Sequence, residues 1–239
     1  MTRIHVPAPL AVDVRLALPE AAARHVGQVL RMHPGELIIL FNGAGGEYDA
    51  VIETVEKRAV QVRVESYREI ERESPLAMTL AQCVSKGERM DYTIQKAVEL
   101  GAAAIVPLLS ARSVVKLDGE RWEKKLEHWR GVVISACEQS GRTHVPQLLP
   151  VQKLETWLGT AAGARFVLAP GGHHRLKELA PVQAATLLVG PEGGLDDREV
   201  ALAVHRGFTA IGLGPRVLRT ETAGVAALAA LQALWGDLG

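Results

Sequence analysis

The pattern of apolar and polar positions changes character once along the chain. Over the first 72 residues, the apolar run Leu37–Phe41 precedes the turn sequence NGAGG, and the alternating segments Tyr48–Val55 and Ala59–Val64 follow. Alternation with a period of two is typical of strands with one buried face, and their close spacing favours antiparallel pairing. The pattern predicts a small β-rich sheet or barrel over residues 1–72, with one helix over Pro19–Met32.

The spacing of apolar residues changes after the charged stretch YREIERESP, which we interpret as a linker. From Leu76 onward, apolar runs of strand length alternate with segments whose apolar residues recur at helical spacing, and this favours a mostly parallel sheet covered by helices on both faces. We therefore expect an α/β domain over residues 73–239, in which ligands bind beyond the carboxyl ends of the strands. The expected strands are 76–84, 104–109, 166–169, 187–190 and 209–213, and the expected helices are 88–100, 118–141, 197–206 and 219–235.

Composition narrows the class of protein. Lys plus Arg equals Asp plus Glu, 27 each, so any nucleic-acid site must be a local cluster of cations. No apolar stretch approaches the roughly 20 residues that span a bilayer, and MTRIHVPAPL lacks the layout of a signal peptide, so we expect a cytoplasmic protein without a membrane partner. Cys83 and Cys137 lie in apolar segments without CxxC spacing, which predicts buried thiols and no metal site.

Two expected strands end in similar corners, LLVGPEGG and IGLGPRVLRTETAG. The phosphate-binding patterns G-x-G-x-x-G and G-x-x-x-x-G-K-S/T are missing from the sequence. The carboxylate of Glu192 would repel a pyrophosphate, so a cationic ligand without phosphate, such as S-adenosylmethionine, fits better. Asp196 and Glu199 form a D-x-x-E capping pattern, so we expect Asp196 and Asp197 to begin a helix and not to carry chemistry.

The corners VGPEGGLDDREV and LGPRVLRTETA, together with HVGQVLRMHPGE, SKGERMDYTIQKAVELGA and ACEQSGRTHVP, resemble the motifs of the bacterial 16S ribosomal RNA uracil-N3 methyltransferases, a family of the SPOUT superfamily. The resemblance covers the whole chain. It implies a PUA-like RNA-binding β-barrel domain over 1–72 and a SPOUT α/β methyltransferase domain over 73–239. The second domain would contain a deep trefoil knot, a rare exception to the usual chain-threading rules, and form a homodimer.

The resemblance also implies an activity, namely methylation of N3 of a uridine in the decoding region of 16S rRNA, with S-adenosylmethionine as donor and no metal. Whether free rRNA or the assembled small subunit is the substrate stays open. The donor would be held by three loops, made of Leu168, Ala169 and Pro170, of Gly190, Pro191, Glu192, Gly193 and Gly194, and of Leu213, Gly214, Val217, Leu218, Arg219 and Thr222.

Methylation at N3 requires loss of the N3 proton and in-line attack on the methyl group, so positioning and charge placement dominate. Arg219 or Arg142 is a candidate to stabilise the pyrimidine anion, and Glu221 or Glu138 is a candidate general base. Glu221 is equally explained by favourable charge at a helix N-terminus, and Glu138 by a structural pairing with an arginine.

RNA contacts are expected from a set of cationic side chains within these motifs, although each one alone is equally compatible with a solvated surface role. We interpret Tyr92, His173 and His174 as surface or packing residues. The expected RNA-binding set is Arg24, His25, Arg31, Lys86, Arg89, Lys96, Arg112 and Arg142.

Two other functions remain to be weighed. SPOUT ribose 2'-O-methyltransferases usually carry an N-G-x-x-x-R motif and a Ser-x-Asn segment in the last loop. This chain has LRTETAG in that loop, which disfavours the ribose-methylating alternative. A non-catalytic RNA-binding assembly factor is the other alternative.

Overall fold

The computed structural model describes residues 1–115, 117–172 and 174–239, so His173 lies outside the described residues. The described chain divides into two compact units. The smaller unit contains Met1–Glu73 and Cys137–Val145, and the larger unit contains Ser74–Ala136 and Pro146–Gly239.

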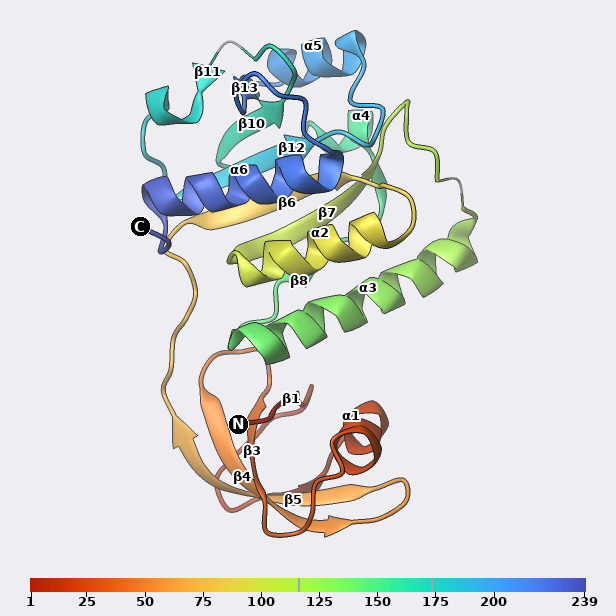
Figure 1. The fold of residues 1–239 in the computed structure, drawn as a ribbon, viewed down its shortest axis with the longest axis vertical. Helices are drawn as coiled ribbons and strands as arrows, with labels where there is room; N and C mark the ends of the chain where they lie inside the picture. Colours follow the sequence, from red (N-terminus) through yellow and green to blue (C-terminus); the bar gives the residue numbers. More distant parts are fainter. Residues whose placement is uncertain (116, 173) are drawn as a thin grey trace. The chain divides into compact units, whose positions relative to one another are not determined.

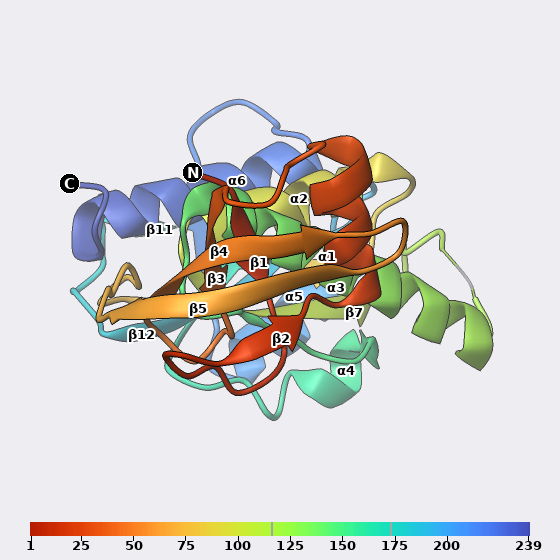
Figure 2. The same cartoon turned by 90° about the horizontal axis from the view of Figure 1, so that it is seen from below.

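The smaller unit is built on a sheet in the order β1-β3-β4-β5-β2, and the segments predicted as strands from residue 37 to residue 64 all belong to it. β1 is parallel to β3, and the other neighbours are antiparallel; Figure 2 shows β2, β4 and β5 side by side. The predicted helix is shorter than expected. The elements are β1 (Arg3–His5), β2 (Arg15–Ala17), α1 (Glu20–Arg24), the π-helix η1 (His25–Val29), β3 (Leu37–Phe41), β4 (Glu47–Val55) and β5 (Val60–Arg68).

The core of the smaller unit joins this short helix to the sheet. Ala23 and Val26, one turn apart, are buried in one cluster with Ile38, Ile52 and Val62 from successive strands. Alternate positions of the strands face this core, which explains the period of two seen in the sequence.

The larger unit contains, in the described chain, a sheet in the order β11-β13-β10-β12-β6-β7-β8, with β9 also paired to β7. Every pairing in it is parallel. The strands are β6 (Ala77–Cys83), β7 (Ala102–Leu109), β8 (Gln147–Leu148), β9 (Gln152–Lys153), β10 (Ala164–Leu168), β11 (His174–Arg175), β12 (Ala184–Val189) and β13 (Thr209–Gly212).

Helices cover both faces of this sheet (Figure 1). On one face, Leu154, Trp157 and Ala203 pack against alternate strand residues such as Cys83 and Leu188, while α2 and α6 lie on the other face. The prediction of a parallel α/β domain is confirmed. The helices are α2 (Glu88–Glu99), α3 (Gly119–Ser140), α4 (Leu154–Trp157), the 3-10 helix η2 (Leu176–Glu178), α5 (Asp197–His205) and α6 (Thr220–Trp235).

Two local predictions, the helix cap and the buried thiols, are confirmed. Asp196 caps α5, because its side chain accepts the N–H of Glu199 while the Glu199 carboxylate accepts the N–H of Asp196. Cys83 and Cys137 are buried and form no disulfide in the described chain, and burial raises the pKa of each thiol to about 12. None of the described helices is long and apolar enough to cross a membrane.

Candidate functional site

The loops after β10, β12 and β13 meet at one edge of the larger unit's sheet. β10 pairs with both β12 and β13 in parallel, so the carboxyl ends of all three strands share that edge. The loop after β10 also touches the end of β13: Ala169 N donates to Ile211 O at 3.2 Å. A Cβ on Gly172 would lie 2.5 Å from the Ile211 carbonyl carbon, so only glycine fits this close approach.

Backbone geometry explains two of the three glycines in the corner Gly190–Gly194. A Cβ on Gly190 would lie 2.7 Å from Leu195 N, and Gly194 has φ +68°, a left-handed conformation that favours glycine. Gly193 has neither constraint: the three atoms nearest to a Cβ there belong to the side chain of Arg112, the first at 3.4 Å. Neither backbone contacts nor backbone conformation require glycine at position 193, so the missing side chain leaves the backbone there open to a ligand.

Glu192 is held by α2 and the loop before it. Its Oε1 accepts the N–H of Lys86 at 2.8 Å and the Nη1–H of Arg89 at 3.0 Å. Partial burial acts to raise the pKa of Glu192, but these backbone and guanidinium hydrogen bonds outweigh it and hold the pKa below its usual value. Glu192 thus stays ionised and braces the corner against α2.

Glu221, in the first turn of α6, faces the same arginine. Arg89 Nε lies 3.8 Å from Glu221 Oε1, and the Glu221 side chain is only 15% exposed. Its other oxygen, Oε2, is buried and has no hydrogen-bond partner among the described residues. A buried carboxylate oxygen left without a donor is costly, so Oε2 of Glu221 has unused capacity to accept a proton.

A buried hydrogen-bond chain joins the ends of β6 and β12 to the start of α6. Gln82 Nε2 donates to Thr220 Oγ1 at 2.9 Å, and Thr220 Oγ1 donates to Gly190 O at 2.5 Å. Sequence reasoning missed both side chains. A signal existed for Gln82, because an amide at the end of an otherwise apolar strand must find partners when it is buried.

The remaining expected donor-loop residues sit on the same loops with different exposure. Val217 is 89% exposed, and Gly214, with φ +92°, turns the loop after β13. Arg219 is the residue before the first turn of α6 and is exposed, as is Thr222. Pro170 is exposed, Pro191 is buried, and Leu168, Ala169, Leu213 and Leu218 are half-buried.

The expected RNA-binding side chains fall into distinct settings. The side chains of Arg89 and Arg112 lie at the corner, because Arg89 binds Glu192 and Arg112 Nη1 donates to Gly193 O at 2.8 Å, whereas Lys86 contacts Glu192 through its backbone N–H. Lys96 is neutralised by Glu99, with both carboxylate oxygens at 2.8 Å. In the smaller unit, Arg24, His25 and Arg31 are exposed.

Arg142 and Glu138 belong to the smaller unit. Arg142, 4% exposed, forms an ion pair with Glu73, and its carbonyl accepts a hydrogen bond from Arg3 at 2.9 Å. Glu138 Oε1 accepts the N–H of His5 at 3.0 Å. These contacts account for both side chains within the fold of the smaller unit.

A parallel α/β sheet whose loops converge at its carboxyl edge is the arrangement in which α/β proteins bind ligands. A family model for an RNA methyltransferase domain matches residues 72–232, and one for an RNA methyltransferase PUA domain matches residues 18–65. The chain belongs to the RNA methyltransferase family whose bacterial members are called ribosomal RNA small subunit methyltransferase E. The family indicated by the sequence motifs is thereby confirmed.

Two members of that name illustrate the match. The protein of Buchnera aphidicola subsp. Schizaphis graminum is 32% identical over 239 residues, which cover 99% of this chain and 97% of the relative. The protein of Bacillus subtilis is 35% identical over 218 residues, covering 87% of this chain and 85% of the relative.

Two solved structures share the fold along their whole length. A methyltransferase structure from Legionella pneumophila with bound SAM has a TM-score of 0.97 and 44% identity, covering 99% of both chains. The ribosomal RNA small subunit methyltransferase E of Neisseria gonorrhoeae, bound to S-adenosyl methionine, has a TM-score of 0.94 and 40% identity, covering 100% of both.

Proposed function

We propose that this chain methylates N3 of a uridine in the decoding region of 16S rRNA, with S-adenosylmethionine as methyl donor. Membership of the small-subunit methyltransferase family supports the rRNA substrate, and the donor-bound relatives support the cofactor. The observation that carries the proposal is the buried, unpartnered Oε2 of Glu221 beside the braced corner Gly190–Gly194.

The residues at this edge fit the donor. When bound, S-adenosylmethionine supplies an electrophilic methyl group on a cationic sulfur. The bare backbone of Gly193 allows close approach of a ligand, and the carboxylates of Glu192 and Glu221 suit a cation better than a phosphate. We assign donor binding to the loops that contain Leu168–Pro170, Gly190–Gly194 and Leu213–Thr222.

For the chemistry, Glu221 takes the N3 proton through Oε2, and Arg219 stabilises the negative charge that develops on the uracil ring. Arg219 is exposed at the start of α6, where its guanidinium is free to approach a substrate. Arg142 and Glu138 form a second candidate pair. Their contacts with Glu73 and His5 in the smaller unit favour the first pair.

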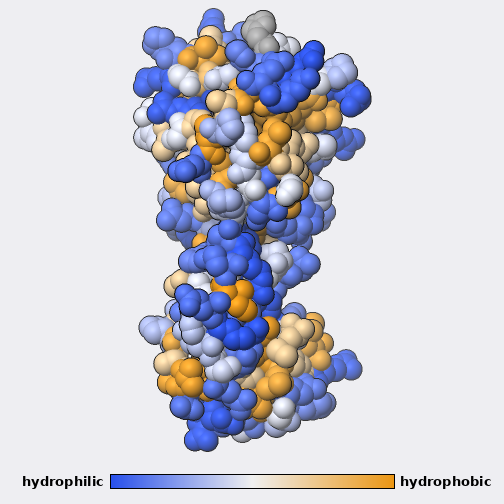
Figure 3. Space-filling view, turned by 90° about the vertical axis from the view of Figure 1, so that its left-hand side faces the viewer, coloured by the Kyte–Doolittle hydropathy of each residue, from blue (hydrophilic) through white to orange (hydrophobic). Residues whose placement is uncertain are grey.

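The wider assignment follows the family. We assign residues 1–72 to a PUA-like RNA-binding barrel and residues 73–239 to a SPOUT domain with a trefoil knot, in a cytoplasmic enzyme that acts on the assembled small subunit. A homodimer through the C-terminal domain is supported by α6, whose only charged residue is Glu221 and whose Leu234 is 47% exposed. Hydrophobic residues reach the surface among hydrophilic ones in Figure 3.

The test is methylation of assembled small subunits that lack the modification, with isotopically labelled donor and nucleoside analysis of the digested rRNA. We expect labelled 3-methyluridine. A ribose-methylated nucleoside would establish the 2'-O-methyltransferase alternative. Binding to the subunit without any label, together with no donor binding by calorimetry, would establish a non-catalytic assembly factor.

A further inference from the structure

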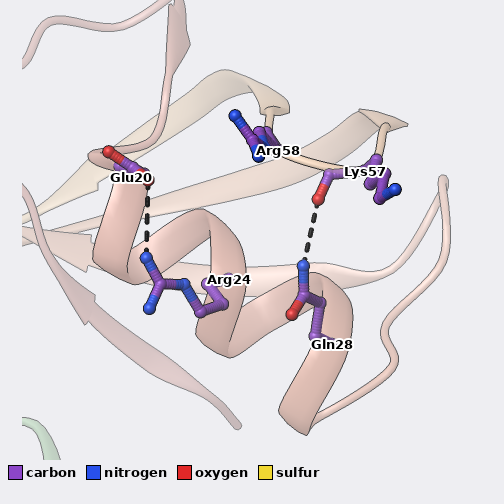
Figure 4. Close-up of a pocket in the computed structure, with 5 residues that line it drawn as sticks. All are labelled: Glu20, Arg24, Gln28, Lys57 and Arg58. Atoms are coloured by element: carbon purple, nitrogen blue, oxygen red, sulfur yellow. Dashed lines mark hydrogen bonds and ion pairs between the residues drawn. The ribbon is translucent and has the colours of Figure 1, made fainter.

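A cavity in the smaller unit is lined mainly by cationic side chains and lies outside the corner described above. Its volume is about 290 Å³, and it is lined by Glu20, Arg24, Gln28, Lys57 and Arg58 (Figure 4). The first three lie four residues apart along α1 and η1, and the last two lie in the turn between β4 and β5. The lining contains three cationic side chains and one carboxylate, so it has a positive excess in a chain whose formal net charge is zero.

The two walls of this cavity are held together by the fold. Gln28 Nε2 donates to Lys57 O at 3.0 Å, which ties the helix to the turn. The turn itself is closed by Glu56 N donating to Ala59 O at 2.8 Å. A Cβ on Gly27 would lie 3.2 Å from Val55, so the helix approaches the strand closely. The positions from which the cations project are therefore set by the backbone.

The three cationic side chains have few partners within the protein. Arg24 Nη2 lies 3.4 Å from Glu20 Oε1, and the two side chains are 63% and 77% exposed, so this pair contributes little. The side chains of Lys57 and Arg58 make no hydrogen bond or ion pair within residues 1–115, 117–172 and 174–239. A phosphodiester would offer all three a charge-assisted partner stronger than any they have in the protein.

We propose that Arg24, Lys57 and Arg58 form a site for the phosphodiester backbone of RNA. The proposal rests on the proposed function only in taking RNA as the ligand. Guanidinium and ammonium groups that bind phosphate oxygens position an RNA without reading its sequence. The site would thus hold a stretch of rRNA backbone by charge, and binding there should be sequence-independent and sensitive to salt.

The test measures RNA binding to the full-length chain, without methyl donor, by fluorescence anisotropy with two labelled hairpin RNAs of unrelated sequence. The double variant Lys57→Ala/Arg58→Ala should bind both RNAs about tenfold more weakly, with the slope of log affinity against log salt reduced by roughly 1.4 to 1.8. The reversal Lys57→Glu/Arg58→Glu should weaken binding further. The matched control Arg121→Ala/Lys124→Ala removes the same charge from the exposed surface of α3 and should change the affinity less than twofold.

Several outcomes would overturn this site. One is an unchanged affinity and salt slope in the double variant, with its circular dichroism and thermal unfolding like those of the wild type. Another is a loss no larger than that of the control. A third is binding of inorganic phosphate, detected by phosphorus NMR at matched ionic strength, that the double variant loses while its RNA affinity stays the same, because this would mark a free-anion site. The proposed function fails separately, if the wild type neither binds the donor nor methylates small subunits.

Discussion

Arg89 Nη1 lies 3.0 Å from Glu192 Oε1, so the start of α2 holds the corner that follows β12. The same guanidinium reaches Glu221 Oε1, at 3.8 Å. One arginine therefore links two carboxylates that come from separate loops, and its removal should disturb both.

We expect Arg89→Ala to weaken S-adenosylmethionine binding about tenfold, equivalent to ~1.4 kcal/mol, because the corner loses its brace. The unfolding free energy should change by only about 0.2–1 kcal/mol, since the pair is partly exposed. Calorimetry and urea unfolding measure the two effects. The control Arg130→Ala removes a 3.1 Å ion pair with Glu127 on the surface of α3 and should leave donor affinity as in the wild type; equal affinity in both variants would refute the brace.

Gly190 and Gly193 should respond differently to substitution. Gly190→Ala places a Cβ 2.7 Å from the Leu195 backbone nitrogen, and such overpacking should lower the unfolding free energy by about 1–3 kcal/mol. Gly193→Val should keep the fold, because the nearest atoms belong to the Arg112 side chain at an ordinary contact distance of 3.4 Å. The branched side chain should fill the space beside the backbone and abolish donor binding. Thermal unfolding and calorimetry separate the two variants, and near-normal donor affinity in Gly193→Val would contradict the assignment of the pocket.

Glu221→Gln should reduce the methylation rate by about 10²–10⁴ with little change in donor affinity, because the amide fills the same volume but cannot take the N3 proton. Single-turnover methylation of small subunits and calorimetry measure these quantities. Glu138→Gln discriminates between the two candidate bases, since an amide oxygen can still accept the N–H of His5. A large rate loss in Glu138→Gln, with Glu221→Gln active, would assign the base to Glu138.

Asp91 links α2 to α3 and should make stability depend on pH. Burial acts to raise the pKa of Asp91, but hydrogen bonds from His128 and Trp129 and the charge of Lys125 outweigh it, so the folded pKa lies below the usual value. The unfolded chain then binds the proton more readily, so this stabilisation is present above the unfolded carboxyl pKa and is lost as pH falls through the folded pKa.

Asp91→Asn should therefore lower the unfolding free energy at pH 7 and change it little near pH 2, as measured by urea unfolding across that range. The reason is local: His128 Nε2 lies 2.6 Å from Asp91 Oδ2, and Trp129 Nε1 lies 2.9 Å from Oδ1. A difference between variant and wild type that stays constant with pH would exclude the ionised carboxylate as its origin.

Glu47→Gln should destabilise the smaller unit strongly. Glu47, with a side chain 1% exposed, forms ion pairs with Arg3, Arg68 and Arg72. Breaking a buried ion pair from one side typically costs about 3–5 kcal/mol, because the remaining charges are left uncompensated. The control Glu53→Gln removes a carboxylate that is 27% exposed on the same sheet and should cost about 0.2–1 kcal/mol. Urea unfolding compares the two, and equal losses would contradict the role of burial.

The local pattern of the sequence was sufficient for the main elements and for several contacts. The period of two in Tyr48–Val55 and the helical spacing of 197–206 depend on near neighbours, and so does the capping of α5 by Asp196. The family could also be recognised from short sequence motifs. The two-residue strands β8, β9 and β11 were missed, because so short a segment carries no period.

Tertiary structure decided the settings of the charged side chains. Arg142 was a candidate for catalysis and RNA binding, but it pairs with Glu73, 69 residues away in the chain, and Glu138 binds the backbone of His5, 133 residues away. The chain of Gln82, Thr220 and Gly190 likewise spans three distant segments. The hydrophobic period along a segment reports which face is buried, whereas the partner of a charge depends on which remote segment the fold brings beside it. The sequence by itself thus determined the elements and the family, and the packing of distant strands and helices decided which charged groups are free to act.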